Sequence, residues 1–139
     1  MMAKECMTRN VKLGSPTMSL AEAAKLMKDG DFGILPVGDK DRLVGMITDR
    51  DITIRAVSEG KDPNRSYVGE VMSKKVLYCF EDQEINEVVK NLGHNQIRRL
   101  PVLSREKRLV GILSLGNIAE SGGSPKEVDE ALIHICKKK

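Results

Sequence analysis

Two ten-residue stretches of this chain contain a hydroxyl residue that is followed three positions later by an acid or an amide. LVGMITDRDI contains Thr48 and Asp51, and LVGILSLGNI contains Ser114 and Asn117 at the same places. Where a strand runs into a helix, free backbone N–H groups attract anions, and a hydroxyl there can contact a phosphate or ribose oxygen. A carboxylate one helical turn later can accept both hydroxyls of a ribose. The spacing therefore predicts a grip for a nucleoside phosphate, written twice.

A purely structural interpretation of the same residues is also open. Thr48 and Ser114 can be helix N-caps that accept from backbone amides two or three residues on. Asp51 can be a first-turn acid that complements the helix dipole. Gly45 and Gly111 can mark strand positions where another backbone comes close.

Both stretches belong to a repeat that covers nearly the whole chain, at about residues 6–60 and 71–122. The tripeptide LPV precedes each stretch, and a methionine followed by a hydroxyl residue opens each copy. A repeat of this kind indicates one structural unit used twice. A single unit of about 50 residues buries little apolar surface, so we expect two units to share a core.

Each copy predicts the order strand, helix, strand, strand, helix. Ser19 and Glu22 form a capping box at the first helix, which Gly30 ends, and Asp82 is the expected cap of its counterpart. Apolar residues at helical spacing predict the buried faces of these two helices: Leu20, Ala23, Ala24 and Met27 in the first copy, and Ile85, Val88, Val89 and Leu92 in the second. The strand pairs are FGILPV with LVGMIT, and IRRLPV with LVGILS.

The expected fold class is α+β, with two repeated β-α-β-β-α units packed by their sheets into one pseudo-two-fold module. A closing helix begins at Ser124-Pro125 and lines one face with Val128, Leu132 and Ile135. The predicted domains are a first unit at 1–65, a linker at 66–70, a second unit at 71–122, and a C-terminal helix with a basic tail at 123–139.

Composition excludes several classes of function. The 139 residues are 40% hydrophobic and 31% charged, which is ordinary for a globular protein, and no apolar run approaches a membrane span. A net charge of +3 with two Phe and two Tyr makes nucleic-acid binding a poor fit. Three scattered cysteines and two isolated histidines predict neither disulfide nor metal. Asp49 and Asp51 are two positions apart, so their side chains point in different directions on a helix and make a poor catalytic acid–base pair. We therefore do not expect an enzyme. We expect a cytoplasmic protein.

The segments LPV, GMITDRD and GILSLGN, doubled and in this order, resemble a tandem pair of cystathionine-β-synthase (CBS) domains, often called a Bateman module. The resemblance extends over almost the full length. The layout, with GKDPNRSYVGEVM between the copies, is similar to small stand-alone CBS-pair proteins of the hypoxic-response or stress type.

The resemblance implies a regulatory module without catalysis, which binds AMP, ADP or ATP, or NAD or S-adenosylmethionine, in clefts between the copies. No cofactor is required, and the regulated protein is unknown. It also implies a homodimer formed through helices, whose exposed faces we expect to carry Met27, Val57 and Val89. The implied first site comprises Thr48, Arg50 and Asp51 for phosphate and ribose, with Asn10, Val11, Ile34, Leu35 and Pro36 around the adenine. The implied second site comprises Ser114 and Asn117, the phosphate contacts Arg98 and Arg99, and the apolar wall of Val76, Leu100 and Pro101.

The two sites are not equivalent. Asn117 lacks the charge of Asp51, and Gly116 stands where the first copy has Arg50. Arg98 and Arg99 replace Gly33 and Ile34 and can equally be surface residues of a strand edge. A protein-interaction module of the same fold with empty ligand sites is therefore an open alternative.

Overall fold

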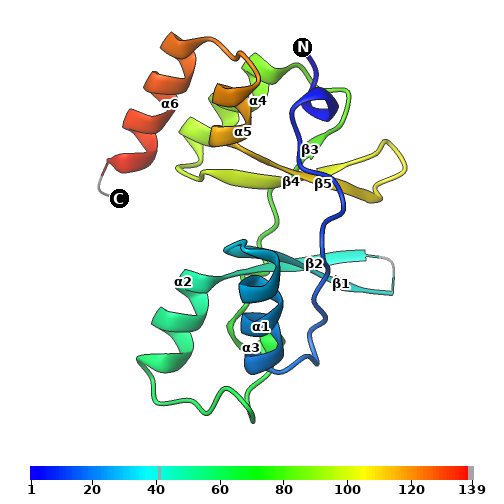
Figure 1. Cartoon of the computed structure of the whole chain (residues 1–139), viewed down its shortest axis with the longest axis vertical. Coiled ribbons are helices and arrows are strands. Elements are labelled where there is room, and N and C mark those ends of the chain that lie inside the picture. The colour runs from blue at the N-terminus through cyan, green and yellow to red at the C-terminus, as the bar shows by residue number, and fades with distance from the viewer. Residues whose placement is uncertain (41, 138–139) are drawn as a thin grey trace. The chain divides into compact units, whose positions relative to one another are not determined.

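The sequence repeat predicts two similar units, and the computed structural model, which describes residues 1–40 and 42–137, divides the chain into two. Unit 2 is continuous, Lys12–Val76, and unit 1 combines Met1–Val11 with Leu77–Lys139 (Figure 1). Both contain helices and antiparallel strands, so the α+β class is confirmed. The compact units differ from the sequence repeats because the N-terminal segment lies in unit 1 with the second copy.

Unit 2 consists of a long helix, a two-stranded antiparallel hairpin and three short helical segments. Ser19 caps α1, since its Oγ accepts from the Glu22 N–H at 3.1 Å. Asp31, in a left-handed conformation with φ 53°, ends the helix. The elements are α1 Leu20–Gly30, β1 Ile34–Asp39, β2 Arg42–Thr48, α2 Asp49–Ile52, a π-helical turn at Thr53–Val57 (η2), and α3 Val68–Val71. The predicted helix and the two hairpin strands of this copy are confirmed. The strand predicted before the helix is absent from the described residues, and only a single bridge joins Gly14 to Val37.

The core of unit 2 lies between α1, the hairpin and α3. It is formed by Leu20, Ala23, Met27, Leu35, Val37, Ile47, Ala56, Val68 and Val71. Ala24, predicted to be buried, is exposed, so the apolar stripe of α1 is narrower than predicted. The segment 66–70, predicted as a linker, contributes Val68 to this core, and the Val68 N–H donates to the Met18 carbonyl at 2.8 Å.

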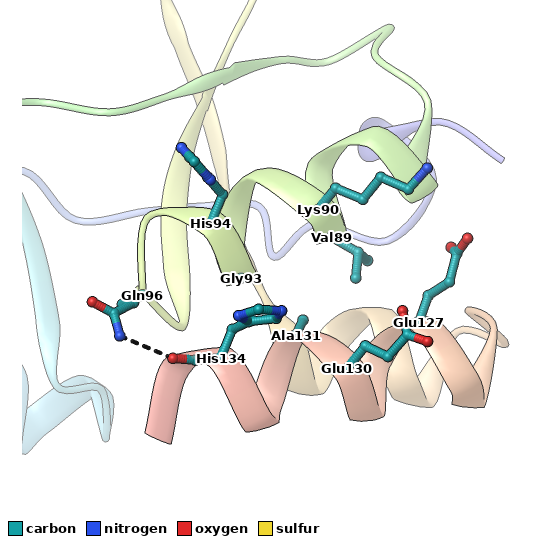
Figure 2. Close-up of a pocket in the computed structure, with 9 residues that line it drawn as sticks. All are labelled: Val89, Lys90, Gly93, His94, Gln96, Glu127, Glu130, Ala131 and His134. Atoms are coloured by element: carbon teal, nitrogen blue, oxygen red, sulfur yellow. Dashed lines mark hydrogen bonds between the residues drawn. The ribbon is translucent and has the colours of Figure 1, made fainter. Parts of the chain in front are cut away.

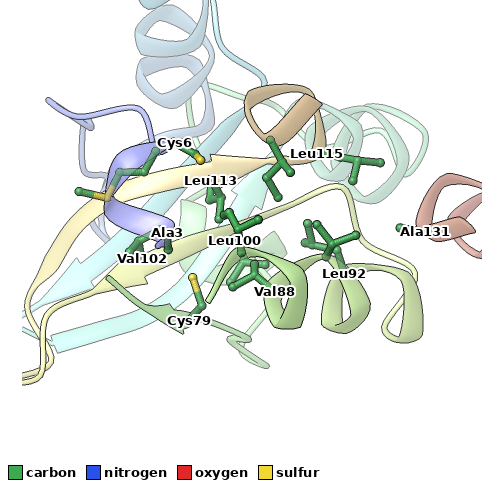
Figure 3. Close-up of a cluster of buried hydrophobic side chains, with 14 residues drawn as sticks. Ala3, Cys6, Cys79, Val88, Leu92, Leu100, Val102, Leu113, Leu115 and Ala131 are labelled. Atoms are coloured by element: carbon green, nitrogen blue, oxygen red, sulfur yellow. The ribbon is translucent and has the colours of Figure 1, made fainter. Parts of the chain in front are cut away.

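Unit 1 has the same plan with additions. Its strands β3 Cys79–Phe80, β4 Arg99–Leu103 and β5 Leu109–Ser114 form one sheet, in which β3 is parallel to β4 and β4 antiparallel to β5. Its helical elements are a 3-10 turn at Ala3–Glu5 (η1), α4 Ile85–His94, α5 Leu115–Glu120 and α6 Pro125–Cys136. Figure 3 shows its core, which includes Ala3 and Cys6 of the N-terminal segment, Val88 and Leu92 of α4, and Leu113 of β5.

The helix α4 begins later than predicted. Its N-cap is Glu84, and Asp82 does not cap it. Asp82 instead pairs with Arg105, with 2.8 Å between Oδ1 and Nη2, and the Arg105 guanidinium lies 4.2 Å from the centre of the Phe80 ring. The prediction that Asp82 caps α4 was wrong because a capping rule considers only neighbouring residues. It takes no account of Arg105, which lies in the β4–β5 loop.

The closing helix α6 packs on α4, as Figure 1 shows. Gly93 permits this contact, since a Cβ there would lie 3.0 Å from the Cα of Ala131. Ala131 is buried, whereas Leu132, predicted on the inner face, is 39% exposed. The predicted cap is confirmed, because Ser124 Oγ accepts from the Glu127 N–H. Among the described residues, no helix combines the length and apolar character needed to cross a bilayer.

Candidate functional site

The strand-to-helix junction of unit 2 is held by a reciprocal cap. The Asp51 N–H donates to Thr48 Oγ1 at 3.0 Å, and the Thr48 N–H donates to Asp51 Oδ2 at 2.9 Å. Both side chains are half-buried. The hydroxyl and carboxylate therefore satisfy two backbone donors that the helix start would otherwise leave free.

The junction of unit 1 repeats this arrangement. The Asn117 N–H donates to Ser114 Oγ at 2.9 Å, and the Ser114 N–H donates to Asn117 Oδ1 at 3.0 Å. The capping interpretation is thus correct at both places, and four residues with predicted ligand roles also have structural ones. A ligand at either junction must use the atoms that the cap leaves over.

Those remaining atoms differ between the junctions. Asp51 keeps Oδ1, a charged acceptor, outside the cap. Asn117 has a single oxygen, which already accepts from the Ser114 N–H, and its other polar group is the NH2, a donor. Its role at a ribose stays a prediction. The asymmetry is one of hydrogen-bond direction as well as charge.

Arg55, which the sequence analysis did not single out, lies beside the free oxygen of Asp51. Its Nε is 3.8 Å from Oδ1, and its Nη1 donates to the carbonyl of Val71 at 3.1 Å. The signal available in sequence was its i+4 spacing from Asp51 on a helix. Because the Arg55 side chain is half exposed, it lies beside the Asp51 carboxylate without excluding solvent from it.

The residues beside the unit 2 junction differ in how far they are buried. Ile34 pairs with Thr48 across the hairpin and is half-buried, so its side chain reaches the surface next to the cap. Leu35 has no exposed surface and belongs to the core, and Pro36 is buried as well. Of the three β1 residues predicted around an adenine, only Ile34 has a side chain that reaches the surface. Arg50 is exposed, and its N–H donates to Asp49 Oδ1 at 2.8 Å.

The equivalent positions of unit 1 are basic. Arg99 pairs with Ser114 across the β4–β5 hairpin, and the Leu115 N–H donates to the Arg98 carbonyl at 2.9 Å. Both arginines are exposed, and Nη2 of Arg98 lies 3.8 Å from Sγ of Cys136, the last residue of α6. Leu100 and Pro101 are buried like their counterparts.

Three predicted contacts lie in the other unit from their expected partners. Asn10 and Val11 belong to unit 1, although the first site is centred on unit 2. Val76 belongs to unit 2, although the second site is centred on unit 1. Asn10 is exposed in a left-handed conformation with φ 59°. Their roles stay predictions.

The glycines of the repeated stretch serve the fold. A Cβ on Gly45 would lie 2.8 Å from the Ser73 carbonyl oxygen, and one on Gly111 would lie 2.7 Å from that of Thr8. Each neighbouring segment forms a two-way bridge with the strand, through Met46 and Ser73 in unit 2 and through Thr8 and Ile112 in unit 1. The predicted close backbone approach is confirmed.

Two pKa shifts in unit 1 arise from burial and from an ion pair. Burial raises the pKa of the Cys79 thiol to about 12, so this cysteine stays protonated in the core of unit 1. The hydrogen bond from Arg105 lowers the pKa of Asp82, outside either junction. Within residues 1–40 and 42–137, no group of three or more His, Cys, Asp or Glu side chains is placed to hold a metal.

A model of the CBS domain matches this chain twice, at residues 3–57 and 68–122. Hypoxic response protein 1 of Mycobacterium tuberculosis is 40% identical over 118 residues, which cover 84% of this chain and 82% of that protein. The CBS domain-containing protein YhcV of Bacillus subtilis is 36% identical over 95% of this chain and 93% of its own. The chain spans 60% of the length of the uncharacterized protein MK0525 of Methanopyrus kandleri, at 38% identity.

Solved structures agree with these matches. The crystal structure of Hypoxic Response Protein I with two coordinated zinc ions has a TM-score of 0.75 and 38% identity, covering 86% of this chain and 98% of that one. A hexameric CBS-CP12 protein from bloom-forming cyanobacteria has a TM-score of 0.77 and 31% identity, covering 86% and 66%. The chain belongs to the CBS-domain family and carries a pair of CBS domains.

Proposed function

We propose that this protein is a regulatory module that binds an adenosine nucleotide, AMP, ADP or ATP, and catalyses no reaction. The observation that carries the proposal is Oδ1 of Asp51, a charged acceptor that takes no part in the cap with Thr48. A charged acceptor held by its own cap is preorganised to receive the hydroxyls of a ribose, because no side-chain freedom is lost on binding. Pairs of CBS domains are typically regulatory ligand-binding modules, which agrees with this chemistry.

The unit 2 junction is the principal site of this proposal. Thr48 and Asp51 contact ribose or phosphate oxygens, Ile34 lies against the base, and exposed Arg50 faces the phosphates. Leu35 and Pro36 contribute through backbone groups, since their side chains are buried. The roles of Asn10 and Val11 at the adenine stay predictions from the family resemblance.

The unit 1 junction has a different preference. Ser114 and Asn117 offer a hydroxyl and an amide donor, and the two neighbouring arginines Arg98 and Arg99 are exposed. Donors and cations favour phosphate oxygens over ribose hydroxyls. We therefore propose that this junction binds nucleotide more weakly than the unit 2 junction, and mainly through phosphate.

A thermal-shift screen tests the proposal, because a ligand that binds only the native state raises the melting temperature by mass action. AMP, ADP and ATP are compared with NAD, S-adenosylmethionine, GMP and UMP at equal concentration. With affinity in the micromolar range, millimolar adenosine nucleotide stabilises by roughly 3 kcal/mol or more, which is a shift of several degrees. Equal protection by GMP and AMP contradicts the adenosine assignment, and protection by NAD or S-adenosylmethionine alone transfers it to those ligands.

A protein-interaction module with empty ligand sites is the second candidate, and one observation favours it. The helical segment after Thr48 exposes two apolar residues, Ile54 (49%) and Val57 (61%). Met27 and Val89, expected on exposed faces, are buried in the cores of their units, so that part of the expectation was wrong.

We propose that this exposed face supports a homodimer at micromolar concentration. A hexameric CBS-CP12 protein among the similar structures is consistent with self-association. Light scattering that reports only the 15.4 kDa species over that range contradicts the dimer. If an Ile54→Ser variant stays dimeric, the dimer interface does not include this exposed face. Dimerisation without any thermal protection by ligands favours the interaction module over the nucleotide sensor.

A further inference from the structure

The Arg55 side chain lies between two acceptors of unit 2. Its Nη1 donates to the carbonyl of Val71 at 3.1 Å, and its Nε lies 3.8 Å from Oδ1 of Asp51. The first contact is a hydrogen bond, whereas the second is too long to be one. The end of the helix α3 therefore holds Arg55 beside the carboxylate of the proposed nucleotide site without a direct bond between the two side chains.

The Val71 carbonyl belongs to the last turn of α3, where a helix leaves its carbonyls without an intrahelical donor. Arg55 supplies that donor. Unit 1 holds the end of α6 in a similar way, since Gln96 Nε2 donates to the His134 carbonyl at 3.0 Å (Figure 2). The amide of Gln96 is neutral, but the guanidinium of Arg55 carries a charge that a carboxylate attracts. The bond to Val71 thus competes with a direct bond to Asp51.

Release from Val71 would let the guanidinium of Arg55 close on Asp51. Side chains four residues apart on a helix are neighbours, and a charge-assisted bond of about 2.8 Å is roughly 1 Å shorter than the separation in this structure. Because 53% of the Arg55 side chain is exposed, little packing opposes the movement. Oδ2 of Asp51 already accepts from the Thr48 N–H. The released guanidinium would occupy Oδ1, the oxygen that a ribose hydroxyl needs.

We propose that Arg55 is an autoinhibitory residue, which α3 keeps away from the nucleotide site. While the end of α3 is closed, Val71 holds the guanidinium, and Oδ1 of Asp51 can accept from a ribose. When this end opens, Arg55 bonds to Oδ1 and nucleotide binding weakens. Because such coupling is reciprocal, bound nucleotide in turn favours the closed end of α3.

The inference rests on the proposed nucleotide function and adds how that site is regulated. Residues 72–76 follow α3 and are the last of unit 2. A partner that moves this segment opens the end of α3 and lowers the nucleotide affinity. The second copy has no equivalent, because Ser121 stands at the position of Arg55, four residues after Asn117. The regulation therefore belongs to the unit 2 junction alone.

Hydrogen exchange of the full chain, with and without AMP, tests the proposal. The reporters are the amides of Met72 and Ser73, which donate to the carbonyls of Val68 at 2.9 Å and Met46 at 2.8 Å and so exchange when this end opens. At AMP about tenfold above the dissociation constant of each variant, mass action slows an opening that abolishes binding by up to about tenfold. We expect the wild-type reporters to slow at least about threefold.

Arg55→Met removes the N–H donors and keeps a long side chain. The effect of AMP on the reporters should fall below about 1.5-fold, because the opening of α3 no longer blocks Oδ1 of Asp51. The amides of α1, whose exchange requires unfolding of unit 2, should slow in wild type and in Arg55→Met alike, since AMP binds both.

Arg65→Met is the matched control. The Arg65 Nε also lies 3.8 Å from a carboxylate oxygen, that of Asp62, and its side chain is exposed in the segment before α3. This variant loses the same charge without touching the Val71 carbonyl, so its reporters should respond to AMP as in wild type.

Four results would overturn the proposal. If AMP slows the reporters equally in Arg55→Met and wild type, the coupling does not pass through Arg55. If the wild-type reporters do not respond while the amides of α1 slow, the coupling is absent and the nucleotide function stands. If AMP slows neither set, both proposals fall. If Arg65→Met loses the response as Arg55→Met does, the effect is one of general charge.

Discussion

Asp51→Asn separates the ligand role of this residue from its role in the helix cap. Asn117 occupies the equivalent place in unit 1 and makes the same reciprocal bonds with Ser114, at 2.9 and 3.0 Å. An asparagine at position 51 can therefore keep the cap and turn its NH2 group outward. The only chemical change at the surface is a charged acceptor replaced by a neutral donor.

The magnitude follows from the bonds concerned. A hydrogen bond to a charged group contributes about 1.5–3 kcal/mol, and a neutral one about 0.5–1.5. The loss of roughly 1 kcal/mol or more corresponds to about a five- to tenfold weaker nucleotide affinity. Arg55 offsets little of this, because its contact with Asp51 is 3.8 Å long and its side chain is half exposed. Stability should change by less than about 0.5 kcal/mol, since the capping bonds persist.

Titration calorimetry with AMP measures the affinity, and a melting curve without ligand measures the stability. Asp51→Ala is the harsher variant: it should weaken binding at least about tenfold and also cost about 0.5–2 kcal/mol of stability, because it deletes the cap. Asn117→Asp is the converse control. It replaces the amide donor of the unit 1 junction with a charged acceptor, and we expect the phosphate-mediated nucleotide binding proposed there to weaken several-fold.

Two results would refute the reasoning. If Asp51→Asn binds AMP like wild type and melts at the same temperature, the free oxygen does not contact the ligand. If Asp51→Asn melts well below wild type, an asparagine does not reproduce the cap, and the likeness of the two junctions is only apparent. Asn117→Ala with a larger loss than Asp51→Ala would move the principal site to unit 1.

Three further predictions concern the scaffold. Gly45→Ala should lower the free energy of unfolding by about 1–3 kcal/mol in a denaturant titration, because its Cβ meets a backbone carbonyl, whereas Gly116→Ala, in an exposed helix, should be neutral or stabilising. Exposed Cys136 should react with a thiol reagent in the native protein, while Cys79 reacts only on unfolding, since burial raises its pKa to about 12; equal rates would contradict this. Asp82→Asn should lower the melting temperature at neutral pH, and this difference should vanish as the pH falls below 3.8 and through the lowered folded-state pKa, because protonation then removes the ion pair in wild type as well.

Local sequence determined the elements and the family. The strands of both copies follow from LPV and the repeated ten-residue stretch, and the buried face of α4 follows from apolar residues at helical spacing. The caps at Ser19, Thr48, Ser114 and Ser124 are readable because each bond joins residues three apart. Signals of this range survive in a single sequence, since helix caps and strand pairs are formed by near neighbours.

The tertiary structure decided how individual atoms of the candidate sites are used. Leu35 was predicted beside the adenine, and it is a core residue, because the hairpin turns that side of β1 toward α1. Asp82 looked like a cap and is bound to Arg105, 23 residues away. The N-terminal segment joins unit 1 through the bridge from Thr8 to Ile112. Contacts between distant residues leave no periodic trace in the sequence. Only the folded chain shows which oxygen of Asp51 stays outside the cap and that Arg55, beside it, also binds the carbonyl of Val71.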